Sequence, residues 1–255
     1  MLRRIASAYL WVAPLMIVPL WYAYHQIGLR AGILCGVAHL VLMGLGMWVL
    51  DMFRWEELST AYGLARLLLT GGGGIVWAIG AAGPPRRHDI TLAFYNNAGL
   101  IVGLFVIFLG LAALKDELQT EKKGALAAVG HASFSFSFVV WIMECFLIWV
   151  ILRAPAAGLP KAQQPDWLLS LFFVWDWIDS VRLGSVYVAG ATFALAGILT
   201  SRINRWPGRL MLAFSLLGVI FGVAQKIPFF IPAVTCVVPY CLGVTLRRPV
   251  GSERV

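Results

Sequence analysis

Glu144 is the residue whose position points most clearly to chemistry. It stands in the apolar stretch Val-Val-Trp141-Ile-Met-Glu144-Cys-Phe-Leu-Ile. A carboxylate inside a bilayer is costly, so such a group is protonated, paired with a cation or faces a wet cavity. Ser137 and Ser133 precede it by seven and eleven residues, which places all three on one helix face. This pattern predicts a proton-binding or ligand-binding carboxyl in a polar track, and the alternative is a structural carboxylic acid bonded to a neighbouring helix.

A second set of ionisable residues follows at Asp176-x-x-Asp179-x-x-Arg182. The i, i+3, i+6 spacing puts the three side chains within one sector of a helix. Two carboxylates so placed could hold a divalent cation that binds a diphosphate, or could form an outer gate with Arg182. The alternative is the water-facing side of an interfacial helix. A single DxxD is weak as a motif, and the sequence lacks the second Asp-rich motif that membrane prenyltransferases need.

The run Gly71-Gly72-Gly73-Gly74 falls in the middle of an apolar segment. Each glycine costs about 1 kcal/mol relative to alanine inside a helix, so the run either admits a neighbouring helix at close range or breaks the helix. A broken helix would expose backbone dipoles to a cargo, and Gly72 and Gly73 would then contact the substrate. Close packing is the commoner explanation. No Gly-Lys-Ser/Thr follows, which excludes a P-loop.

His39 and Trp141 are further candidates for contact with a ligand. His39 lies inside an apolar segment, where a histidine can bind a ligand, relay protons or form a packing hydrogen bond. Trp141 lies beside Glu144, and its ring face could stabilise a cationic ligand. The histidines lie at different depths, which disfavours a transmembrane heme, and the His, Cys and carboxylate spacing offers no metal cluster. We therefore expect no metal site and assign no cofactor.

The elements that carry these residues are predicted to be membrane spans. Of 255 residues, 60% are hydrophobic and 13% charged, whereas soluble domains are about half apolar and a quarter charged. Several apolar runs reach the length of about 20 residues that a span needs. Eight candidate spans lie at residues 6–24, 31–50, 61–82, 91–114, 127–152, 182–201, 209–225 and 228–246. A turn at residues 225–228 separates the last two.

Residues 166–201 are too long for one span, because 36 helical residues would extend about 54 Å. The part before Arg182, which holds Trp167, Trp175 and Trp177, is therefore predicted to lie along the outer interface or to re-enter the membrane.

The distribution of the 20 Lys and Arg residues among the loops predicts the orientation of the chain in the membrane. Apart from Arg182, thirteen fall in one set of loops and six in the opposite set, which places both termini in the cytoplasm.

The predicted fold class is all-α: one transmembrane bundle over residues 1–255, with about eight transmembrane helices plus one interfacial helix and no extramembrane domain. The expected location is the cell (inner) membrane. The net charge of +8 comes from short clusters between apolar segments, so we expect contact with anionic headgroups and no binding of nucleic acid. The expected partners are the lipid bilayer and a small-molecule or lipid ligand.

Three functional hypotheses remain open. The leading one is a small permease or translocation protein, proton-coupled through Glu144, with the glycine run as a flexible helix and Asp176, Asp179 and Arg182 as an outer gate. An intramembrane enzyme acting on a lipid or isoprenoid substrate would use Glu144 as its general acid. Asp176 and Asp179 would then hold the headgroup or a metal. A noncatalytic subunit or assembly factor would have other proteins of a membrane complex as its partners.

Overall fold

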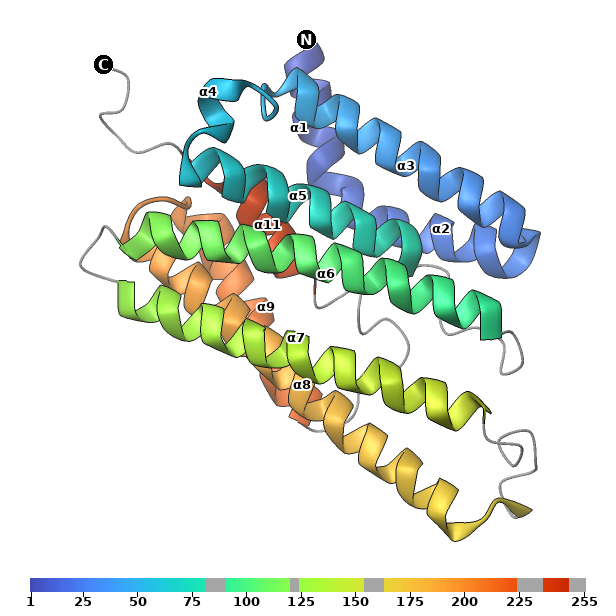
Figure 1. Ribbon diagram of the computed structural model, residues 1–255. Coiled ribbons are helices and arrows are strands. Elements are labelled where there is room, and N and C mark those ends of the chain that lie inside the picture. Colours follow the sequence, from blue (N-terminus) through green and yellow to red (C-terminus); the bar gives the residue numbers. More distant parts are fainter. Residues whose placement is uncertain (81–89, 120–123, 154–162, 224–235, 248–255) are drawn as a thin grey trace.

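The computed structural model describes residues 1–80, 90–119, 124–153, 163–223 and 236–247, and all regular elements within these ranges are helices (Figure 1). Six segments are long and apolar enough to cross a membrane, which agrees with an all-α membrane helix bundle. These six are Leu2–Tyr22, Arg30–Val49, Ala61–Ile79, Asn97–Gln119, Gly124–Cys145 and Asp166–Leu199. The predicted seventh and eighth spans overlap α9 (Arg205–Val223) and α11 (Val237–Thr245), which are not among the six. The turn predicted at residues 225–228 lies outside the described residues.

The first predicted span is bent. It consists of α1 (Leu2–Val12), a 3-10 turn at Ala13–Met16, α2 (Ile17–Tyr22) and a π-helical turn at Ala23–Ile27. Pro14 and Pro19 lie within it. Because proline lacks an amide hydrogen and its ring crowds the preceding turn, the chain changes direction between α1 and α2 (Figure 1). The following helix, α3 (Leu29–Val49), returns along α1.

The glycine run lies inside an unbroken helix, α5 (Ala61–Gly80), so the broken-helix alternative is wrong. A Cβ on Gly72 would lie 2.9 Å from the Ile107 nitrogen and 3.0 Å from the Gly103 oxygen, both in α6 (Ile90–Gln119). A Cβ on Gly73 would lie 2.8 Å from the Tyr240 ring. The glycines therefore let α6 and α11 approach the backbone of α5, which is the close packing that small residues allow in membrane helices.

Two buried clusters hold the helices together. The larger one joins α5, α6, α7 (Gly124–Arg153), α8 (Asp166–Leu199), α9 and α11, and the smaller one joins α1, α3, α5 and α11. Tyr240 on α11 belongs to the smaller cluster: its ring lies 4.4 Å from the Trp77 ring and its hydroxyl donates to the Leu10 carbonyl. The short helix α11 thus joins the N-terminal helices to the rest of the bundle.

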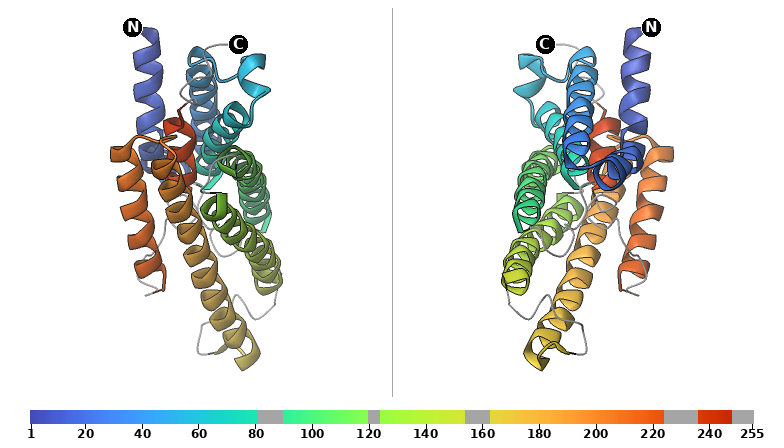
Figure 2. Two further views of the ribbon diagram at one scale, coloured as in Figure 1. Left: turned by 90° about the vertical axis from the view of Figure 1, so that its left-hand side faces the viewer. Right: turned by 90° about the vertical axis from the view of Figure 1, so that its right-hand side faces the viewer.

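The segment 166–199 forms one helix, α8, where we expected an interfacial segment and a separate span from Arg182. Its 34 residues extend about 51 Å at 1.5 Å per residue. Proline is absent between Asp166 and Leu199, so nothing in the backbone interrupts the hydrogen bonds. Trp175 in the first half of α8 also donates a hydrogen bond to Glu144 on α7. Figure 2 shows α8 between α7 and α9.

Candidate functional site

Side chains from α7 and α8 meet about midway along α8 and form what we term the Glu144–Arg182 cluster. On each helix the contributing residues follow the i, i+4, i+7 spacing of one face. The helices run antiparallel, so the two faces meet over their length. Arg182 is about 25 Å from either end of α8 at 1.5 Å per residue. The cluster consists of Ser137, Trp141 and Glu144 on α7 and Trp175, Asp179 and Arg182 on α8.

Glu144 is paired on both of its oxygens. Its Oε2 lies 2.7 Å from Nε of Arg182, and its Oε1 accepts a hydrogen bond of 2.7 Å from the indole Nε1 of Trp175. Only 9% of the Glu144 side chain is exposed. The charge of the guanidinium and the indole hydrogen bond both favour the ionised carboxylate, whereas burial disfavours it. Of the alternatives that the sequence left open for Glu144, the structure thus shows pairing with a cation, Arg182.

Arg182 is the centre of the cluster, with 2% of its side chain exposed. Its Nη2 pairs with Asp179 one turn earlier on α8, and its guanidinium carbon lies 3.9 Å from the centre of the Trp141 ring. The aromatic face adds a cation–π attraction, which is strengthened away from water. The approach of Nε to Glu144 lacks the alignment of a hydrogen bond, and Nη1 has no hydrogen-bond partner among the described residues. A buried guanidinium thus keeps an unused donor.

The formal charges in this cluster do not balance. One guanidinium faces two carboxylates, of Glu144 and Asp179, and the second is more open, with 23% of its side chain exposed. With both carboxylates ionised the cluster carries a net negative charge, and with one proton bound it is neutral. Because an uncompensated charge is costly in a low-dielectric interior, uptake of one proton by this cluster would remove that cost.

Ser137 and Asp176 do not lie where they could bind one ligand together with Glu144. The Ser137 hydroxyl donates a 3.0 Å hydrogen bond to the Arg182 backbone carbonyl, so it links α7 to α8 next to the ion pair. The Asp176 side chain is exposed, whereas Asp179 turns toward Arg182. The structure therefore separates the two aspartates of the DxxD motif. Within the described ranges, no three His, Cys, Asp or Glu side chains are grouped as metal ligands would be.

The remaining sequence candidates lie away from the cluster. His39 is buried on α3, and its Nδ1 lies 2.9 Å from the Tyr9 hydroxyl on α1. This bond joins two N-terminal helices, as the packing interpretation of His39 requires. Gly72 and Gly73 contact α6 and α11 on α5. The structure thus unites Ser137, Trp141, Glu144, Asp179 and Arg182, and it leaves Asp176, His39, Gly72 and Gly73 outside.

A groove of about 430 Å³ runs along the opposite face of α8. Its lining includes Trp177, Ser180 and Ser185 from α8 together with Ser133 from α7 and Val219 from α9. The hydroxyls of Ser180 and Ser185 donate to backbone carbonyls one turn back, at 2.9 Å each. Their oxygens therefore remain available as acceptors toward the groove. A helix that carries the ion pair on one face lines this groove with the other.

The sequence analysis missed two polar contacts, one inside the Glu144–Arg182 cluster and one outside it. Trp175 was assigned to headgroup depth, although its spacing of four and seven residues from Asp179 and Arg182 could have placed it on their face. The second is a partly buried ion pair between Glu117 at the end of α6 and Arg202 just after α8, with an N–O distance of 2.7 Å. Because its members come from segments far apart in the chain, no local spacing could have indicated it.

The fold and the cluster define a class, an all-α membrane protein with a buried ionic centre between two of its helices. Comparison with protein-family models, with curated proteins and with solved structures finds no match for this chain. Function is therefore inferred from the site alone.

Proposed function

We propose that this chain is a small permease of the cell (inner) membrane, coupled to protons through the Glu144–Arg182 cluster. The observation that carries this is the presence of two carboxylates on one buried guanidinium midway along α8. Ionisable groups at this depth in transporters mark proton and ion pathways. The excess of Lys and Arg in one set of loops supports cytoplasmic termini.

In this mechanism Glu144 exchanges the coupling proton. With the proton bound, Arg182 and Asp179 form a neutral pair and the α7–α8 contact carries no net charge. When Glu144 releases the proton, its carboxylate is held by Arg182 and by the Trp175 indole. The two protonation states thus differ in how strongly α7 and α8 attract each other, and a cargo that prefers one state is coupled to proton movement.

The groove on the other face of α8 is the proposed cargo site. Because α8 contributes both Arg182 and the groove residues Ser180 and Ser185, a shift of α8 changes both sites together. The serine oxygens act as acceptors and Trp177 supplies a ring face, a combination that suits a small cargo with N–H donors, such as an amine. Rigid-body displacement of one packed element against another is a common mode of alternating access.

The geometry gives less support to an intramembrane enzyme. That hypothesis needs Asp176 and Asp179 to bind one headgroup or metal together. Asp179 is instead engaged by Arg182, and Asp176 is exposed. The permease hypothesis agrees with the observed position of Asp179, which is the second carboxylate paired with the Arg182 guanidinium.

The test is Glu144→Gln in proteoliposomes. Glutamine keeps the size of glutamate and a carbonyl oxygen for the Trp175 indole, but it cannot exchange a proton. Solid-supported membrane recordings with a panel of small amines, amino acids and sugars should give pH-dependent currents for the unmodified protein and a loss of at least about tenfold for this variant, as expected when an intramembrane carboxyl is essential. Glu56→Gln, which removes an exposed carboxylate from α4 (Trp55–Leu58), should leave the currents unchanged.

Two outcomes oppose the proposal. If Glu144→Gln carries the same currents with the same pH dependence as the unmodified protein, Glu144 is not the coupling group. The second outcome combines two results. No panel member produces a current in any form of the protein, and infrared titration of the unmodified protein shows no titrating carboxyl that is missing from Glu144→Gln. The cluster is then only a structural ion pair.

A further inference from the structure

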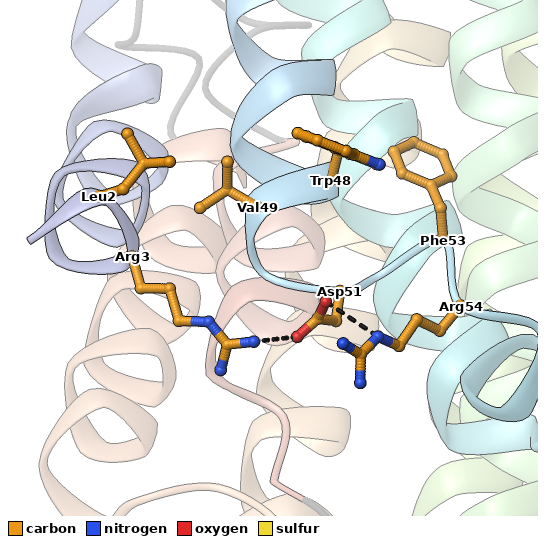
Figure 3. A pocket seen from close by; sticks show the side chains of 7 residues that line it. All are labelled: Leu2, Arg3, Trp48, Val49, Asp51, Phe53 and Arg54. Carbon is orange, nitrogen blue, oxygen red and sulfur yellow. Dashed lines mark hydrogen bonds and ion pairs between the residues drawn. The ribbon is translucent and has the colours of Figure 1, made fainter.

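A second charged site lies at the ends of α1 and α3, away from the Glu144–Arg182 cluster (Figure 3). It is a cavity of about 490 Å³, open to the surroundings, which we term the Arg3–Arg54 cavity. Its lining comes from the first turn of α1, the last turn of α3 and the loop that follows α3. The lining residues are Leu2, Arg3, Trp48, Val49, Asp51, Phe53 and Arg54.

The backbone at the end of α3 fixes the position of Asp51. The Asp51 amide donates to Trp48 at 2.9 Å and the Met52 amide donates to Met47 at 3.0 Å. This pair of bonds, with Asp51 at a φ of 59°, is a Schellman motif in which aspartate takes the left-handed position usually given to glycine. Met47 and Met52 are both buried and complete the motif with an apolar contact. The carboxylate is therefore held at the cavity by an ordered helix end.

Asp51 pairs with one arginine through each of its two carboxylate oxygens. Arg54 Nε lies 2.9 Å from Oδ1 of Asp51, and Arg3 pairs with Oδ2 from the opposite side, as Figure 3 shows. The site has two guanidinium groups for one carboxylate and a formal charge of +1. The Arg3 and Arg54 side chains remain 68% and 61% exposed, so most of their N–H donors are available to a further partner. Paired guanidinium groups are suited to the oxygens of a phosphate.

The side chains around the two arginines suit a membrane interface. Both α1 and α3 belong to candidate spans, and the cavity lies where these spans end. Trp48 is 66% exposed, and Leu2 and Phe53 also expose their apolar side chains next to it. Exposed tryptophan at a span end is typical of headgroup depth, where its ring contacts both acyl chains and water. A cationic pair at that depth, bordered by apolar side chains, matches an amphiphile with an anionic head.

We propose that the Arg3–Arg54 cavity binds the phosphate of an anionic phospholipid. The guanidinium groups of Arg3 and Arg54 contact the phosphate oxygens, and Asp51 holds one arginine on each side of the site. Trp48 packs against the part of the acyl chains nearest the headgroup. The bound lipid then joins α1 to the loop after α3. Free phosphate offers the same oxygens but no acyl chain for Trp48, Leu2 and Phe53 to contact.

The test is native mass spectrometry of the full chain in detergent, titrated with phosphatidylglycerol or with phosphatidylcholine. The unmodified protein should bind one phosphatidylglycerol molecule, and it should bind it more tightly than it binds phosphatidylcholine. Arg3→Gln/Arg54→Gln should weaken that binding about thirtyfold, which corresponds to about fivefold for each basic side chain at the membrane surface. The matched control Arg4→Gln/Arg209→Gln removes the same charge from exposed positions outside the cavity and should change binding less than about twofold.

Three further measurements decide the outcome. Far-ultraviolet circular dichroism of both double variants verifies that each is folded, and Arg3→Lys/Arg54→Lys, which keeps the charge but loses the planar guanidinium groups, should give intermediate binding. Excess inorganic phosphate should not displace the lipid. Equal phosphatidylglycerol binding by the cavity variant and its control overturns the proposal, and displacement of the lipid by inorganic phosphate overturns the assignment to a phospholipid.

Discussion

Removal of the central cation of the Glu144–Arg182 cluster should cost more stability than any surface charge. In Arg182→Gln the carboxylates of Glu144 and Asp179 lose the cation that they share, and the Trp141 face loses its cation–π partner. Removing one member of a buried ion pair typically costs about 3–5 kcal/mol, because the other charge is left uncompensated. The exposed 23% of the Asp179 side chain admits some water and places the expected loss near the lower limit, about 3 kcal/mol.

The assay is reversible unfolding in mixed micelles, followed by far-ultraviolet circular dichroism. Arg182→Lys keeps the charge but reaches the two carboxylates from a single ammonium, so its loss should be about half as large. The control Arg205→Gln, at an exposed position at the start of α9, should stay within about 0.5 kcal/mol of the unmodified protein. A loss below about 1 kcal/mol for Arg182→Gln would refute the view that the two carboxylates depend on this cation.

Two other predictions concern single contacts. Trp175→Phe removes the indole donor to Glu144 and should lower the free energy of unfolding by about 1.5–3 kcal/mol, the usual range for hydrogen bonds to charged groups, whereas Trp167→Phe at an exposed position should change it little. Gly72→Ala places a Cβ against the backbone of α6 and should destabilise by about 1–3 kcal/mol. Gly71→Ala meets no atom within 4 Å and should stabilise by about 0.5–1 kcal/mol. Thermal unfolding measures all four variants, and shifts of the same sign for the two glycines would contradict the close packing of α5 against α6.

The position of each helix followed from the sequence more readily than its shape. Apolar length places α3, α5 and α7 within a few residues of the predicted spans, because a span must be apolar over about 20 residues. The same length criterion failed for α8, which we divided at Arg182. That division rested on length, and length cannot show that both Trp175 before the division and Arg182 at it are held by Glu144 on α7.

The candidate site was partly foreseen for a comparable reason. Helical periodicity assigned Ser133, Ser137 and Glu144 to one face of α7, and it assigned Asp176, Asp179 and Arg182 to one sector of α8. The structure brings Ser137, Glu144, Asp179 and Arg182 together and leaves Ser133 and Asp176 out. Periodicity within a helix is local and can be counted along the chain. It does not show which face of one helix meets which face of another.

By itself, the sequence determined that this protein is helical, that its helices are suited to a membrane and that Glu144 is protonated, paired or near water, since backbone hydrogen bonding and the cost of a buried charge follow from local composition. Only the tertiary structure decided that the partner is Arg182, that Trp175 completes the pair, and that Asp179 rather than Asp176 shares the cation. These choices depend on the register between antiparallel α7 and α8, which arises from packing along the whole length of both helices.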